Sequence, residues 1–126
     1  MRLVLTDSIR KAEFEPLEKT FSLEVIKIAA KKCLEGLGKE IKSSTKVPST
    51  SLKKLNLTST GGAGRAAFLL QIRHGKAILV MVRPKNDKKI GANMSIENPN
   101  FKKTLEKNLC LLMADIENAN FEEFEL

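Results

Sequence analysis

The chain has 126 residues, of which 42% are hydrophobic and 29% charged, and its formal net charge is +7. This length predicts one domain, residues 1–126, with room for a single modest core. The longest apolar runs, Ala77–Val82 and Leu109–Ala114, fall far short of the roughly 20 residues that span a bilayer. The first residues also lack the small-residue cleavage site of a secretory signal. We therefore expect a cytoplasmic protein with no membrane partner.

The few cysteine and histidine residues argue against a metal site. Two cysteines, Cys33 and Cys110, lie at apolar positions of expected helices, so they are predicted to be buried free thiols. The single histidine, His74, falls at an expected hairpin tip and is predicted to be a turn residue. We expect no metal and no cofactor.

The charge is distributed unevenly along the chain. All 22 basic residues and 10 of the 15 acidic residues precede residue 114, which gives residues 1–113 a net charge of +12. The other five carboxylates lie in an acidic C-terminal extension at about residues 114–126. A local excess of this size is typical of proteins that bind a polyanion, although a merely solvated lysine-rich surface has the same composition.

The first half of the chain predicts two strands and one long helix. Arg2–Thr6 is short, apolar and partly β-branched, which favours a strand. Ser22 is a good N-cap for a helix that runs to about Lys42, with Gly36 and Gly38 favouring an earlier end. Ser51–Leu57 alternates imperfectly between apolar and polar residues and predicts a second strand.

Residues 61–87 have the pattern of a β-hairpin. If His74-Gly75 forms a two-residue turn, residue i pairs with residue 149 − i, and Phe68 faces Met81. One face of the hairpin is then apolar, whereas the other is apolar at its centre and basic at its margins. This pattern predicts a sheet with one face covered by helices and the other forming a shallow cationic groove.

The remaining elements complete the expected fold. A short strand is predicted near residues 92–96, and Asn98 followed by Pro99 predicts the start of a second helix. The order of elements predicts an α+β fold, with helices packed on one face of a small antiparallel β-sheet. Two interpretations of the acidic extension remain open: it masks the basic groove, or its apolar residues complete the core.

The expected groove could support phosphoryl chemistry without histidine. Cleavage of RNA by attack of the 2′-hydroxyl requires stabilised phosphoryl oxygens and a proton for the leaving 5′-oxygen. Arginine binds such oxygens through its planar fork, and a lysine crowded by other cations can transfer a proton because its pKa is lowered. A sheet that holds Lys53 or Lys54 next to Arg65 and near Lys85 permits this chemistry.

Short motifs in the same region resemble those of a known family. The motifs are Lys53-Lys54 on a strand, Gly61-Gly62 followed by Arg65, Gly75 in the hairpin turn, and Lys85-Asn86 after the hairpin. Together they resemble the RelE/HigB-like toxins of bacterial type II toxin–antitoxin systems, within the RelE/ParE superfamily. The resemblance covers about residues 22–113.

This resemblance implies a microbial-RNase-like sheet and a ribosome-dependent mRNA endoribonuclease that inhibits translation. Its partners would be mRNA, the ribosome and a cognate antitoxin protein. The implied catalytic residues are Lys53, Lys54, Arg65 and Lys85. The implied RNA-binding residues are Arg73, Lys76, Arg83, Asn86, Lys88 and Lys89.

Two alternatives stay open. Many members of the family carry a late Tyr or His near the scissile phosphate, whereas this chain has no Tyr and no His after His74. The first alternative is a toxin-fold protein without RNase activity, such as a ParE-like topoisomerase binder. The second is a module that only binds nucleic acid or protein.

Overall fold

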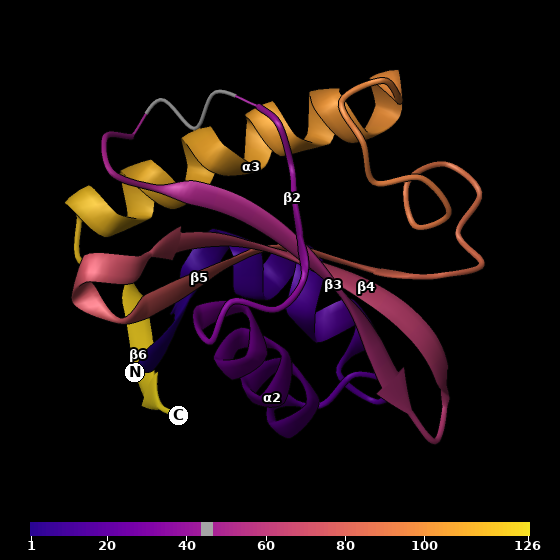
Figure 1. Ribbon diagram of the computed structural model, residues 1–126, viewed down its shortest axis with the longest axis horizontal. Helices are drawn as coiled ribbons and strands as arrows, with labels where there is room; N and C mark the ends of the chain where they lie inside the picture. The colour runs from indigo at the N-terminus through magenta and orange to yellow at the C-terminus, as the bar shows by residue number, and fades with distance from the viewer. Residues whose placement is uncertain (44–46) are drawn as a thin grey trace.

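The computed structural model describes residues 1–43 and 47–126 and confirms the α+β class (Figure 1). A six-stranded, mostly antiparallel sheet forms its centre. The elements, in chain order, are β1 (Arg2–Thr6), α1 (Asp7–Ile9), the π-helical turn η1 (Arg10–Phe14), the 3-10 turn η2 (Glu15–Leu17), α2 (Leu23–Leu34), β2 (Lys39–Glu40), β3 (Ser51–Ser59), β4 (Gly62–Gln71), the 3-10 turn η3 (Ile72–His74), β5 (Lys76–Pro84), α3 (Pro99–Glu117) and β6 (Phe121–Glu125).

The strands are arranged in the order β2-β3-β4-β5-β1-β6. Strands β2 to β5 form an antiparallel meander, and β1 joins β5 in a parallel pair. The last strand, β6, adds antiparallel to β1 at the far edge of the sheet. The two edges of the sheet are therefore made by a short strand, β2, and by the acidic end of the chain.

Both long helices begin at the predicted caps. Ser22 caps α2 by accepting a hydrogen bond from the Val25 N–H at 3.4 Å, and Asn98 caps α3 by accepting one from the Asn100 N–H at 3.1 Å. Helix α2 ends at Leu34, before the predicted Lys42. The early end follows from Gly36, whose φ of 98° is left-handed and stops the helix.

Both faces of the central strands are covered. All six residues of Ala77–Val82 are buried, so neither face of β5 is open. Helix α2 packs on the face that carries Leu55 and Leu57. On the other face, η1 and α3 pack against β5, where Glu13 of η1 and Asn108 of α3 form hydrogen bonds with its backbone. The open cationic groove predicted for one whole face is therefore wrong. Cationic side chains stay accessible only at the margins of the sheet.

The hairpin register differs from the prediction. The connection between β4 and β5 is longer than two residues, because η3 forms a 3-10 turn that Gly75 closes with a left-handed φ of 62°. Lys76 consequently pairs with Gln71, and Phe68 pairs with Leu79 instead of Met81. The register shifts by one residue beyond Phe68, which leaves Val80 as a bulge and places Met81 opposite Ala67.

The acidic extension completes the sheet. After α3, Ala119 adopts a left-handed φ of 57°, and the chain returns as β6 alongside β1. Phe121, Phe124 and Leu126 are half-buried and pack against the core. The fold therefore supports the interpretation that the extension completes the core. Masking of the basic residues on β2 and β3 is not supported, because β6 lies at the opposite edge of the sheet.

Two further predictions do not hold. Residues 92–96 form turns and not a strand, because side chains instead of a neighbouring strand bind their carbonyls: Asn98 donates to the Asn93 carbonyl and Arg65 to the Ala92 carbonyl. Cys110 is exposed, whereas Cys33 is buried as predicted.

None of the helices in the described part of the chain has the length and apolarity to cross a membrane.

Candidate functional site

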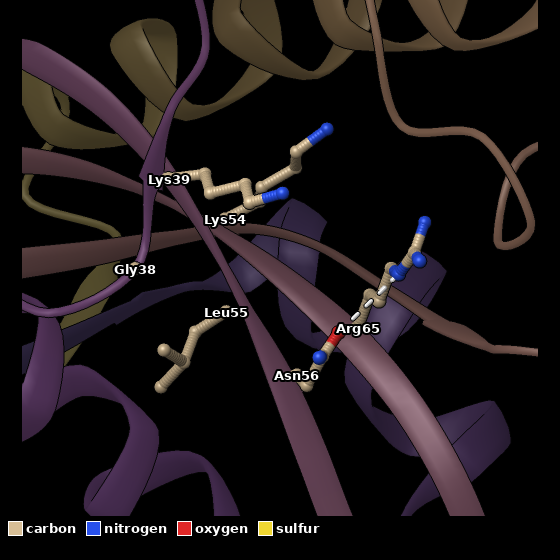
Figure 2. Close-up of a pocket in the computed structure, with 6 residues that line it drawn as sticks. All are labelled: Gly38, Lys39, Lys54, Leu55, Asn56 and Arg65. Carbon is tan, nitrogen blue, oxygen red and sulfur yellow. Dashed lines mark hydrogen bonds between the residues drawn. The ribbon is translucent and has the colours of Figure 1, made fainter.

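Strand pairing brings three cationic side chains to one margin of the sheet. Lys39 of β2 pairs with Lys54 of β3, and Asn56 of β3 pairs with Arg65 of β4. Paired residues of antiparallel strands project from the same face. The three cations line a shallow pocket of about 180 Å³, whose walls are Gly38, Lys39, Lys54, Leu55, Asn56 and Arg65 (Figure 2).

Hydrogen bonds hold two of the three cations in place. The Lys54 Nζ donates to the Met94 carbonyl at 2.8 Å. Arg65 donates from Nε to the Asn56 Oδ1 at 3.3 Å and from Nη1 to the Ala92 carbonyl at 3.2 Å. An ammonium has three donors and a guanidinium five. Most of the donors of both groups are therefore left for a ligand, and the bonds to neutral acceptors leave both charges uncompensated.

The electrostatics of the pocket are those of an anion site. Burial lowers the pKa of Lys54 below its ordinary 10.5, and the nearby charges of Arg65 and then Lys39 lower it further. Within the described part of the chain, none of these three cations forms an ion pair with a carboxylate. A phosphate would relieve this repulsion, and a lysine with a lowered pKa transfers a proton more readily near neutral pH.

The structure separates the four residues implied to be catalytic. Lys54 and Arg65 meet in the pocket, but Lys53 projects from the opposite face, where its Nζ donates to the Gly36 carbonyl at 3.2 Å. Lys85 follows β5 and lines a different hollow, together with Gly61 and Gly62 at the mouth of the hairpin. The alternation of side chains along β3 separates Lys53 from Lys54.

The six residues implied to bind RNA also divide into groups. Arg73, Lys88 and Lys89 are exposed, and Asn86 lies beside Lys85 at the hairpin mouth. Lys76 and Arg83 instead form internal ion pairs. The Lys76 Nζ lies 2.8 Å from the Glu123 Oε1, and Arg83 pairs with Glu13 and with Asp87.

Lys39 is the pocket residue that sequence reasoning missed. The sequence pattern places it within a long helix, whereas it lies in β2 because the helix ends before Gly36. The signal is present in the sequence, because two glycines precede Lys39 and mark the end of the helix. A short strand after them can pair with the Lys53-Lys54 strand.

A second polar cluster lies under the bulge in β5. The Glu13 carboxylate is 3% exposed and accepts hydrogen bonds from the Val82 N–H at 3.0 Å, from Arg83, and from Asn108 Nδ2 at 3.2 Å. Asn108 also donates to the Val80 carbonyl at 2.9 Å. A buried carboxylate is stable only with such partners. This cluster therefore fixes η1 and α3 to β5.

The fold and the pocket together define a small α+β protein with a cluster of cations at one margin of its sheet. Within the described residues, no carboxylate forms an ion pair with these cations. No protein-family model, no curated protein and no solved structure matches this chain. Across residues 1–43 and 47–126, no three His, Cys, Asp or Glu side chains are grouped so that they could hold a metal ion.

Proposed function

We propose that the protein binds RNA through a phosphate at Lys39, Lys54 and Arg65, and that it acts as a toxin-type, ribosome-dependent mRNA endoribonuclease. The observation that carries the proposal is the convergence of these three cations without an ion-paired carboxylate among the described residues. By contrast, Lys76 and Arg83 form ion pairs with Glu123 and Glu13. Cations kept together against their mutual repulsion indicate an anionic ligand.

The pocket offers a division of labour for RNA cleavage. The planar fork of Arg65 binds two phosphoryl oxygens, and Lys39 adds positive charge nearby. In the reaction the 2′-oxygen–phosphorus bond forms and the 5′-oxygen–phosphorus bond breaks. Lys54, whose pKa is lowered, donates the proton to the leaving 5′-oxygen, and the proton of the 2′-hydroxyl passes to solvent.

The resemblance to RelE/HigB-like toxins supports the same pocket. Two of its motif residues, Lys54 and Arg65, are the two that meet there. A toxin of this class would have the ribosome and a cognate antitoxin as partners and would act in the cytoplasm. These partners rest on the resemblance.

The proposal is tested by inducing the wild-type chain and Arg65→Ala in cells and mapping mRNA ends by primer extension. We expect new ends within minutes of induction of the wild type and none with Arg65→Ala. Arg2→Ala is the matched control, because Arg2 lies at the opposite margin of the sheet and forms ion pairs with Glu123 and Glu125. Equal cleavage by the wild type and Arg65→Ala would refute the catalytic role. RNA binding without any cleavage by the wild type would leave a binding module.

A further inference from the structure

A second hollow adjoins the cationic pocket. Lys54 lines both, so the two hollows share a wall. The second hollow has apolar lining from Ile41, Met94 and Ile96, and its polar lining includes Ser95 and Glu97. Ile41 and Met94 are buried, whereas Ile96 is 40% exposed and so is accessible to a ligand.

A third hollow continues the same line onto α3. It shares Ile96 and Lys42 with the second hollow and is lined by Lys102, Cys110 and Met113 of the helix. Each hollow shares lining residues with the next, and the three together are here called the trough. The trough begins at the unpaired cations and continues over apolar side chains that have basic residues beside them.

The chemistry of the trough fits a ligand in which anionic groups alternate with flat apolar groups. Single-stranded RNA has this composition, because unpaired bases expose apolar faces between phosphates. An acidic peptide is the other candidate polyanion. It fits less well, because Glu97 and Glu106 line the apolar part of the trough, where a peptide rich in carboxylates would be repelled but an RNA can place an uncharged base. The same carboxylates can accept hydrogen bonds from the amino groups of bases.

We propose that single-stranded RNA occupies the trough, with one phosphate at Lys54 and Arg65 and the neighbouring unpaired base against Ile96. This inference rests on the proposed function and deepens it, because it names an unpaired base as the feature that the protein recognises. Ser95 and Glu97 are positioned at this subsite to contact the edge of the base. A duplex keeps its bases stacked and paired and cannot place one there.

A pair of matched isoleucine substitutions tests the base subsite. Ile96→Ser removes the apolar contact, and Ile28→Ser is the control, because Ile28 is 56% exposed on α2, on the other face of the sheet. Binding is measured by fluorescence anisotropy with a short single-stranded RNA and with the same length of abasic ribose-phosphate chain. We expect Ile96→Ser to weaken binding of the RNA by about threefold to tenfold, since apolar area is lost from the contact. Binding of the abasic chain should not change, and Ile28→Ser should change neither.

Arg65→Ala distinguishes failure of this inference from failure of the proposed function. If Arg65→Ala weakens both probes and Ile96→Ser weakens neither, the phosphate site stands and the base subsite is refuted. If Arg65→Ala changes neither probe, the proposed function itself is refuted. A poly-glutamate peptide that displaces the RNA at lower concentration than unlabelled RNA would make the trough a peptide site and overturn the inference.

Cys110 is a built-in reporter of occupancy at the α3 end of the trough. It is exposed, whereas Cys33 is buried and burial raises the pKa of the Cys33 thiol to about 11, so iodoacetamide will modify Cys110 first. We expect single-stranded RNA to slow alkylation of Cys110 in the wild type but not in Arg65→Ala, and duplex RNA of the same length to slow it less. An alkylation rate that saturating RNA leaves unchanged, or that duplex slows equally, would contradict the proposal.

Discussion

The two margins of the sheet hold their cations in opposite ways. At the margin formed by β1 and β6, the acidic end of the chain supplies partners: the ion pairs are Arg2–Glu123, Arg2–Glu125, Arg10–Glu122 and Lys76–Glu123. At the margin formed by β2, β3 and β4 lie Lys39, Lys54 and Arg65 (Figure 2). These three cations have no such partner among the described residues. Net charge alone would not distinguish these two margins. The presence or absence of a carboxylate does, and it directs the functional proposal to the second margin.

Two arginines make the same contrast at close range. Arg65 and Arg83 pair across β4 and β5. Arg83 is bound to the buried Glu13 carboxylate, whereas the hydrogen bonds of Arg65 within the described residues go to neutral oxygens. A cation that compensates a buried carboxylate is needed for folding, and one without such a partner is available for a ligand.

The largest expected effect is that of Arg83→Ala. This substitution leaves the buried Glu13 carboxylate without its cation, so we expect it to lower the free energy of unfolding by about 3 kcal/mol. Arg65→Ala should lower it by less than about 1 kcal/mol, because only bonds to partly exposed neutral groups are lost. Urea denaturation of both variants checks the prediction. Equal losses of stability would remove the distinction between the two arginines.

The next largest effect is expected from removal of β6. Truncation after Asn120 exposes the edge of β1 and removes the half-buried Phe121 and Phe124. We expect a loss of about 2 kcal/mol in the free energy of unfolding, seen as a lower Tm, with the affinity for RNA at the pocket unchanged. A tighter complex with RNA after truncation, above all at low salt, would instead show that the tail masks the cationic surface.

A smaller effect is expected from Lys54→Arg, and it depends on pH. Only the protonated Lys54 attracts phosphate, and its pKa is lowered from 10.5 by burial and by neighbouring cations. The affinity of the wild type for RNA should therefore begin to fall at a lower pH than for an ordinary lysine. A guanidinium stays charged over this range, so Lys54→Arg should hold its affinity as the pH rises. Anisotropy titrations from neutral pH to the ordinary lysine pKa of 10.5 measure the difference, and identical profiles would contradict a role for Lys54.

The smallest effect is expected from Glu123→Gln at the other margin. A hydrogen bond from Lys76, and then one from Arg2, hold the pKa of Glu123 below its ordinary 4.5. Such a carboxylate stabilises the fold above its ordinary pKa of 4.5, and this contribution is lost as the pH falls through the lowered pKa. Glu123→Gln should therefore lower stability at neutral pH by less than about 1 kcal/mol. In thermal melts the difference from the wild type should shrink below pH 4.5, with RNA binding unaffected throughout.

Much of the fold could be predicted from local signals. The strand Arg2–Thr6, the caps Ser22 and Asn98, and the α+β class follow from residue types and their spacing. The hairpin register could not be predicted, because it depends on the length of the η3 turn and, beyond Phe68, on the Val80 bulge. That bulge lies over the contact between Asn108 and the Val80 carbonyl, which joins segments 28 residues apart in the sequence.

The candidate site was predictable only in part. Lys54 and Arg65 can be identified from their motifs, but no local pattern shows that Lys76 and Arg83 have carboxylate partners. Those partners, Glu123 and Glu13, lie 47 and 70 residues away along the chain. Which cations are neutralised is a property of the tertiary structure, and it is this property that separates the two margins.

The most direct test of the account is the salt dependence of RNA binding in three proteins: the wild type, Arg65→Ala and Lys76→Ala. A lysine or arginine that contacts a phosphate of a single strand contributes about 0.7 to the slope of log affinity against log salt. We predict that Arg65→Ala lowers the slope by about this amount and that Lys76→Ala leaves it unchanged. An affinity that does not respond to salt, or a slope that falls with Lys76→Ala and not with Arg65→Ala, would contradict the account.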